Sequence, residues 1–228
     1  IGIKTNDGLV FASDSRTNAG LDNVNIYSKM MTHDVGDRTV VIVTSGNLGT
    51  SQAVYKSIEK DLNSSSGIMN LNTCNDFEQI ASYIGSLNIE HSSPQGINTD
   101  NVLLGSTFIV GGQIKGQQHE LYLVYPQGNY IRPADSKPYL VIGEVKYGKP
   151  ILDRVIKPEV SIGDASRCAM ISMDSTLKSD LTVGPPIDFA VHKKNADKLV
   201  TLECLNVTDD AYSKVCNEWS EGIFKVFD

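Results

Sequence analysis

The first strand pair of this chain constrains its fold more than any other feature. Apolar residues alternate with polar or small ones on both sides of Asn6-Asp7-Gly8. Alternation with a period of two is typical of strands, and Asp-Gly is a preferred hairpin turn, so the sequence predicts a β-hairpin over residues 1–14. Because the chain begins inside the first strand of this hairpin, we expect the α-amine of Ile1 to lie in the core.

Two charged residues near this hairpin can be interpreted in two ways. Asp14 closes the second strand, and Lys29 follows fifteen positions later. Taken alone, Asp14 is a turn residue at a strand end and Lys29 a surface lysine. A charge on an apolar strand is costly unless it is paired, however. A buried amine, a carboxylate and a lysine together are what an N-terminal nucleophile needs, since the amine acts as general base and the lysine lowers the pKa of the hydroxyl. This second interpretation predicts a hydrolase, with Asp14 and Lys29 paired near Ile1.

The N-terminal residues resemble those of proteasome β subunits and HslV, which are N-terminal-threonine hydrolases. The matching positions are Gly2, Asp7, Gly8, residues 9–14, Arg16, Gly20, Lys29, Ser45 and Gly46. The run from Gly8 to Gly20 resembles most closely the bacterial proteasome-like family called Anbu. The match is dense over residues 1–53, looser to Gly184 and weak beyond. The resemblance implies an α+β fold, the four-layer αββα sandwich of Ntn hydrolases, over a single domain of residues 1–228.

Several site residues follow from this resemblance. The catalytic candidates are Asp14, Lys29, Gly46 as oxyanion donor, and Asp180; the substrate-binding candidates are Thr17, Asn18 and Thr44. Aligning Gly2 with the first strand glycine of the family places the nucleophilic threonine about three residues before Ile1. Either such residues precede Ile1, which we favour because Asp14 and Lys29 are kept, or this form is not catalytically competent.

Two elements depart from the family pattern. Val183 stands where Asp-x-x-Ser-Gly has its serine, and Gly143-Glu144 stands where the family has glycine and serine. The first departure weakens the hydrogen-bond network expected around Asp180. The second makes Glu144 a further site candidate.

The remaining pattern alternates strands and helices. We expect helices over residues 48–62, from Asn75 or Asp76 to Leu87, over 164–179 with Asp164 as cap, and over 209–227. Strands are expected at 38–45, 103–114, 120–125, 129–132 and 138–142, the last four in a second sheet, and at 187–192 and 199–205. The loop before the 103–114 strand covers residues 91–101. This order suits two stacked sheets covered by helices.

Composition excludes several classes of function. The 228 residues carry a net charge of −7 without a run of lysines or arginines, so nucleic acid and anionic membranes are poor partners. Four cysteines without a CxxC pair indicate reduced thiols and a cytoplasmic location. The four histidines are widely spaced, no phosphate-binding loop is present, and no apolar stretch could span a bilayer. We expect no cofactor and no metal.

Three functions remain open. The first is a threonine peptidase that self-associates into a ring or spiral homo-oligomer and cleaves peptides or unfolded protein. The second is a non-catalytic scaffold subunit of such an assembly. The third is an Ntn amidase that acts on a small amide. The helices at 48–62 and 77–87 are the expected subunit contacts, because they present apolar surface.

Overall fold

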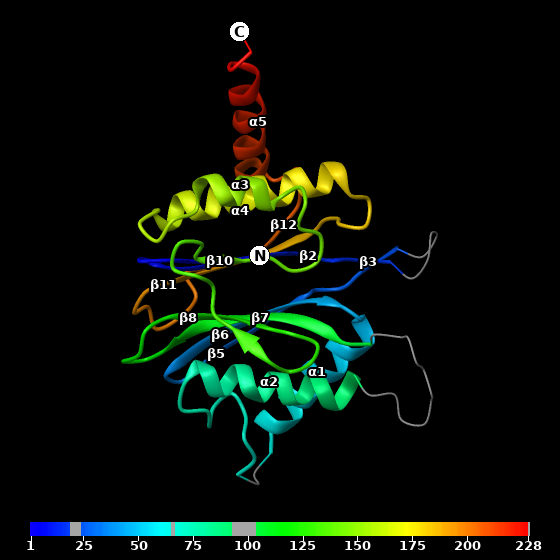
Figure 1. Cartoon of the computed structure of the whole chain (residues 1–228), viewed down its shortest axis with the longest axis vertical. Coiled ribbons are helices and arrows are strands. Elements are labelled where there is room, and N and C mark those ends of the chain that lie inside the picture. The colour runs from blue at the N-terminus through cyan, green and yellow to red at the C-terminus, as the bar shows by residue number, and fades with distance from the viewer. Residues whose placement is uncertain (19–23, 65–66, 93–103, 228) are drawn as a thin grey trace.

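The structure is a computed structural model that describes residues 1–18, 24–64, 67–92 and 104–227. Figure 1 shows two stacked sheets with helices on both outer faces, which is the predicted αββα sandwich. The layers run from α3 (Lys149–Val155) and α4 (Ile162–Ser179) through the first and second sheets to α1 (Leu48–Leu62) and α2 (Phe77–Ser92).

The first sheet contains the predicted hairpin. Its order is β10 (Tyr139–Leu140), β1 (Gly2–Thr5), β2 (Gly8–Asp14), β11 (Ile187–Lys193) and β12 (Thr201–Leu205), all antiparallel. In the hairpin Gly2 lies opposite Phe11 and Thr5 opposite Gly8. The placement of residues 138–142 in the second sheet is wrong, because β10 pairs with β1. The chain crosses there to the free edge of β1, and an apolar pattern does not specify the partner of a strand.

The second sheet is an antiparallel meander. It contains β5 (Met30–Val35), β6 (Arg38–Gly46), β7 (Ser106–Ile114), β8 (Glu120–Val124) and β9 (Tyr130–Ile131) in that order. A separate two-stranded ribbon, β3 (Arg16–Asn18) with β4 (Val24–Ile26), connects the two sheets along the chain. The end of β2 and the start of β5 are therefore close in sequence but lie in different sheets.

The helix boundaries differ from prediction in α2, α4 and α5. The helix α2 continues to Ser92, past the expected end at Leu87, and residues 93–101 of the expected loop lie outside the described part of the chain. The helix α4 begins at Ile162, because Ser161 caps it by accepting a hydrogen bond from the Asp164 N–H at 3.1 Å. The prediction of Asp164 as cap is therefore wrong. A serine followed three residues later by an acidic residue is a common signal for the start of a helix. Ser161 and Asp164 form this signal, but Ser161 precedes the apolar stripe from which the helix was predicted. The last helix, α5 (Asp210–Phe224), ends before residue 227.

Apolar residues form three cores, one in each gap between layers. The core between the two sheets, which we call the intersheet core, contains five fully buried residues: Leu9, Phe11, Val41, Ile109 and Leu121. A Cβ at Gly111 would lie 2.8 Å from the Phe11 ring and 2.8 Å from Leu121, so a side chain at this position would force these neighbours to shift. The two sheets can approach closely at this point because a side chain is missing there.

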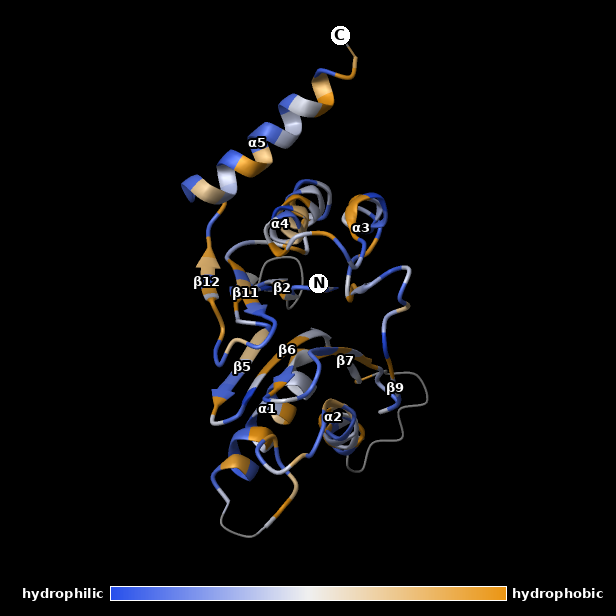
Figure 2. Cartoon of the chain, turned by 90° about the vertical axis from the view of Figure 1, so that its left-hand side faces the viewer, coloured by the Kyte–Doolittle hydropathy of each residue, from blue (hydrophilic) through white to orange (hydrophobic). Residues whose placement is uncertain are grey.

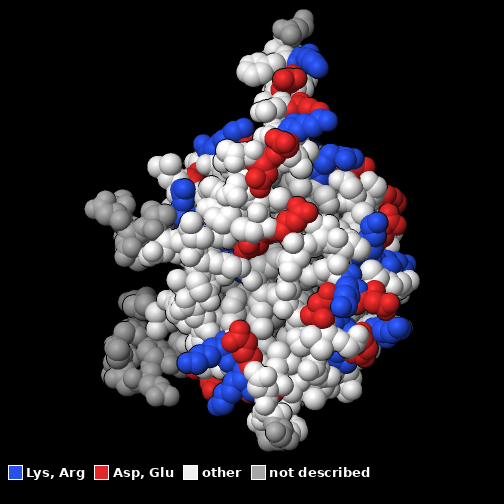
Figure 3. Space-filling model, turned by 180° about the vertical axis from the view of Figure 1, so that it is seen from behind, with Lys and Arg blue, Asp and Glu red and all other residues white. Residues whose placement is uncertain are grey.

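The helix α5 starts beside α4 and projects outward beyond the four layers (Figure 2). It buries Tyr212 and Cys216 against the body of the domain, while Phe224 and Phe227 beyond them are largely exposed. On the face in Figure 3, basic and acidic side chains of the described residues are interspersed.

All four cysteines are free thiols. In the described ranges no helix has both the length and the apolar character needed to cross a membrane. No group of three metal-ligating side chains gathers among those same residues.

Candidate active site

The α-amine of Ile1 lies where β1 begins, inside the domain. Ile1 is 7 % exposed, and its amine donates a hydrogen bond of 2.8 Å to the Ala12 carbonyl. Burial lowers the pKa of this amine to about 5, and the nearby Asp14 carboxylate partly opposes that effect. This end of β1 therefore lies in a desolvated environment, which favours the neutral form of an ionisable group.

Asp14 ends β2 and is held on both carboxylate oxygens. Its Oδ1 accepts a hydrogen bond of 2.7 Å from Lys29 Nζ, so the predicted ion pair is present. Its Oδ2 accepts the backbone N–H groups of Arg16 at 3.2 Å and Gly184 at 3.3 Å. A carboxylate with three donors and little exposure is fixed in position, so it holds the lysine in turn.

Lys29 reaches Asp14 from the second sheet. It directly precedes β5, and its carbonyl accepts the Thr44 N–H at 2.9 Å and the Tyr55 hydroxyl at 3.1 Å. Tyr55 belongs to α1, is buried, and has a raised phenol pKa because of that burial. The lysine backbone is thus tied to β6 and to α1. Sequence reasoning missed Tyr55, although its place on the buried face of α1 beside Val54 and Ile58 was a usable signal.

Gly46 lies at the junction of β6 and α1. Its φ of 113° and a Cβ position only 3.1 Å from the Gly105 carbonyl require glycine. The next residue, Asn47, caps α1 by accepting the Thr50 N–H at 3.1 Å. The junction therefore sits at the positive end of a fifteen-residue helix, where developing negative charge is stabilised.

Two adjoining hollows contain these groups. The inner cavity, of about 190 Å³, extends from Ile1 past Asp14 and Lys29 to Glu144. The outer cleft, of about 830 Å³, runs from Lys29 past Gly46 to the β3–β4 ribbon. Both share Lys29, Thr44, Ser45 and Thr182. The hollow that reaches Ile1 and the hollow that reaches Gly46 therefore meet at Lys29.

Of the three substrate-binding candidates, Thr17 and Thr44 line the outer cleft. Thr17 lines the cleft from β3 and donates its hydroxyl to the Asn25 carbonyl at 3.0 Å. Thr44 is buried beneath the cleft, with its Oγ1 2.9 Å from Ser51 Oγ. Asn18 occupies β3 opposite Val24, and its side chain lies outside the described part of the structure.

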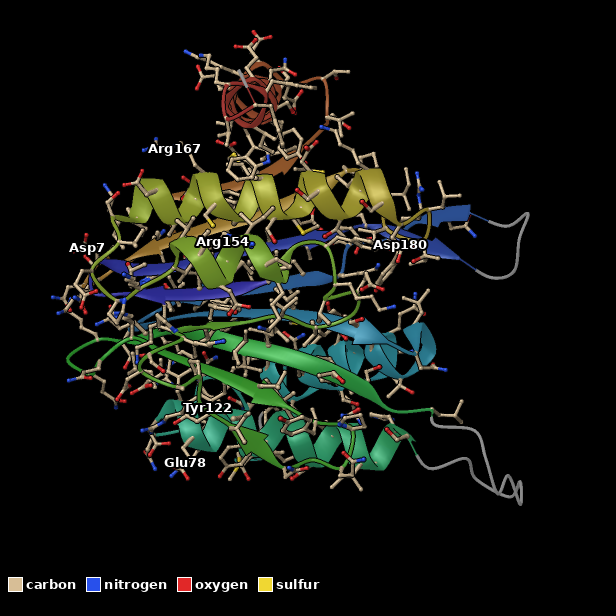
Figure 4. The ribbon with its side chains drawn as sticks, turned by 45° about the horizontal axis from the view of Figure 1, so that its top comes forward. Asp7, Glu78, Tyr122, Arg154, Arg167 and Asp180 are labelled. Carbon is tan, nitrogen blue, oxygen red and sulfur yellow. The ribbon has the colours of Figure 1, made fainter. Side chains whose placement is uncertain are left out.

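Asp180 and Glu144 differ in their relation to the inner cavity. Asp180 follows α4 at one end of the sandwich (Figure 4), and its Oδ1 accepts the Thr182 N–H at 2.8 Å and hydroxyl at 2.7 Å. These bonds hold the pKa of the Asp180 carboxyl below its usual value. The structure does not place Asp180 among the cavity-lining residues, whereas Glu144 lines the cavity and accepts the Lys146 N–H at 2.8 Å.

Comparisons with known proteins agree with this geometry. Residues 1–192 match the family described as "Proteasome subunit". No curated protein matches the chain.

Similar solved structures include Anbu from Yersinia bercovieri, at 34% identity and a TM-score of 0.92, covering 99% of this chain and 95% of that one. A structure described as the helical assembly of the Anbu complex from Pseudomonas aeruginosa has 36% identity, a TM-score of 0.92, and coverages of 99% and 94%. Anbu from Hyphomicrobium sp. strain MC1 has 35% identity, a TM-score of 0.90, and coverages of 99% and 95%.

Proposed function

The chain belongs to the proteasome subunit family, and we propose that it is a threonine peptidase subunit that hydrolyses peptide bonds with an N-terminal nucleophile placed about three residues before Ile1. The observation that carries this proposal is the Asp14–Lys29 ion pair at 2.7 Å, beside the buried α-amine and facing both hollows.

The strand register supports that placement of the nucleophile. Ile1 lies opposite Ala12, because the Ala12 N–H donates to the Ile1 carbonyl at 3.0 Å and Gly2 pairs with Phe11. Continued pairing puts the first residue before Ile1 opposite Ser13, the second opposite Asp14 and the third opposite Ser15. On the other side Gly2 pairs with Leu140 at the end of β10, and the same register continued would bring the third residue beside Glu144. These flanking residues, Ser13, Asp14 and Glu144, line the inner cavity.

Each group has a chemical role in the proposed reaction. The free amine of the threonine accepts the hydroxyl proton as general base. The Lys29 ammonium stabilises the alkoxide, and Asp14 holds that ammonium in place. The Gly46 N–H at the start of α1 stabilises the negative charge that develops on the attacked carbonyl oxygen. The amine then returns its proton to the leaving nitrogen.

Self-association is part of the same proposal. The Pseudomonas aeruginosa relative is described as a helical assembly, and we propose a ring or spiral of this chain with α1 and α2 at subunit contacts. The cytoplasm suits such an assembly, given four cysteines that remain thiols.

The first residue and intact mass of the purified protein test the proposal directly. A free N-terminal threonine, together with a mass increase of one molecule of a peptide epoxyketone or β-lactone per chain, supports the peptidase. A Lys29→Ala variant that takes up no label serves as control. An unlabelled chain without a terminal threonine or serine would indicate the scaffold. Turnover of small amides without turnover of peptides would indicate the amidase.

A further inference from the structure

The inner cavity contains one carboxylate that has no counter-charge. Of the described residues that line it, Asp14, Lys29 and Glu144 have charged side chains. Asp14 is paired with Lys29 at 2.7 Å, whereas no lysine, arginine or histidine of the described residues lies within ion-pair distance of the Glu144 carboxylate. The side chains of the cavity therefore carry a net negative charge, which favours a positively charged group inside it.

The turn after β10 fixes the position of Glu144. Gly143 has a φ of 77°, which favours glycine, and a Cβ there would lie 2.9 Å from Ser45 Oγ, so the turn rests against the end of β6. Glu144 is half-buried, and its Oε1 accepts the Lys146 N–H at 2.8 Å. Within the described ranges no hydrogen bond engages Oε2, so this oxygen can accept a donor.

The walls contributed by α4 and by the segment after it add no charge to the cavity. Their lining residues are Ser172, Met173, Thr176, Thr182 and Val183. The buried carboxylate of α4, Asp174, is not part of the lining and is paired with Lys178 at 2.7 Å. Glu144 and the Asp14–Lys29 pair therefore determine how the cavity acts on a charged group.

The strand β1 leads the chain into this cavity. Residues before Ile1 would extend along Ser13 and Asp14, which line the cavity, and the register continued beyond β10 brings the third of them beside Glu144. An α-ammonium at that point has lost much of its water, as it has at Ile1, where burial lowers the pKa of the amine. A charged amine in such surroundings needs a partner, and Glu144 is the lining carboxylate that has none.

We propose that Glu144 binds the α-ammonium of the N-terminal nucleophile and acts as a positioning residue, which holds the amine beside the hydroxyl that it deprotonates. This inference rests on the proposed function, because it assigns a partner to the amine of that nucleophile. The negative charge of Glu144 raises the pKa of the amine and so opposes the effect of burial. An amine whose pKa is brought toward the working pH is a better general base than one left without a partner.

Titration of the terminal amine tests this role apart from turnover. The protein is acetylated briefly with acetic anhydride between about pH 5 and 9, and tandem mass spectrometry of the N-terminal peptide measures modification of the α-amine. Peptide turnover is measured over the same range. In Glu144→Gln we expect the amine pKa and the acid limb of the rate profile to shift down by about one unit, because the protonated amine loses its counter-charge. Glu144→Asp, which keeps the charge, should show a smaller shift.

Glu159→Gln is the matched control. It removes the same charge from an exposed turn beside Pro158, whose carbonyl accepts the Asn6 N–H at 2.7 Å. The neighbouring Asp7 lies at the end of the sandwich away from Asp180 (Figure 4). The amine of this variant should titrate as in the wild type.

The outcomes separate the role of Glu144 from the peptidase. An unchanged amine pKa in Glu144→Gln would overturn the proposed role. A shifted pKa without turnover of any peptide would uphold the role and reject the peptidase, and turnover without a shift would do the reverse. A blocked α-amine in the purified wild-type protein would reject both.

Discussion

Replacing Lys29 by alanine separates a catalytic lysine from a structural one. The ion pair that it breaks is short, 2.7 Å, and partly buried, with 20% and 12% of the two side chains exposed. Asp14 would keep its two backbone N–H donors but lose its counter-charge. Removing a partner from a fully buried pair costs several kcal/mol, and exposed pairs cost under 1, so we expect a loss of about 1–2 kcal/mol in the free energy of unfolding.

The expected loss of activity is much larger than the loss of stability. Removing one group that stabilises developing charge costs on the order of 3 kcal/mol in the transition state, which is a factor of about 150 in rate. Fluorogenic peptide turnover and urea unfolding of the same preparations measure the two quantities. The double variant Asp14→Asn with Lys29→Ala should regain part of the lost stability, since no charge is left unpaired, while staying inactive.

Lys4→Ala supplies the matched control. It breaks a similar pair, Lys4 with Glu120 at 3.1 Å and with 29% and 20% of the side chains exposed, at the other end of β1. It should cost comparable stability and leave turnover unchanged. A Lys29→Ala protein that retains the full peptidase rate of the wild type would refute the mechanism and move the active site elsewhere.

Four further outcomes follow from the geometry. Tyr55→Phe, which removes a hydroxyl bond to the Lys29 carbonyl, should cost about 1 kcal/mol in thermal unfolding and lower turnover severalfold. Gly46→Ala forces a side chain onto a backbone with φ of 113° and should destabilise by about 1–3 kcal/mol in urea titration; an unchanged midpoint would contradict the strain. Burial lowers the pKa of both His119 and His192, so the unfolded chain takes up their protons first, and stability should be complete above about pH 6.5 and fall as the pH drops below it, as urea midpoints at pH 7.5 and 5 would show. Light scattering at micromolar concentration should report an assembly, and a stable monomer would contradict the proposed self-association.

The sequence predicted structure best where a residue pattern is compatible with few local structures. The hairpin could be predicted because Asp7-Gly8 between alternating apolar runs has few other solutions, and the Asp14–Lys29 pair because a charge ending an apolar strand needs a partner. The partner of β10 could not be predicted, since two apolar residues, Tyr139 and Leu140, suit the edge of either sheet.

The contacts of the site were less accessible to sequence reasoning. Tyr55 acts through a hydroxyl that only the docking of α1 brings to the Lys29 carbonyl. The distance of Asp180 from the inner cavity depends on the local turn, where Thr182 satisfies its carboxylate. Which partner each of these polar groups binds depends on neighbours that come together only in the folded chain. The residue types alone do not identify that partner.

The intersheet core has a consequence for how this site could be altered by evolution or by design. Asp14 belongs to one sheet and Lys29 adjoins the other, so the thickness of the apolar layer, set where Gly111 meets Phe11, acts as a spacer between them. A variant that thickens this layer by one methyl group would draw Asp14 and Lys29 apart while leaving every polar residue in place. The distance between Asp14 and Lys29 therefore depends partly on apolar side chains that line neither hollow.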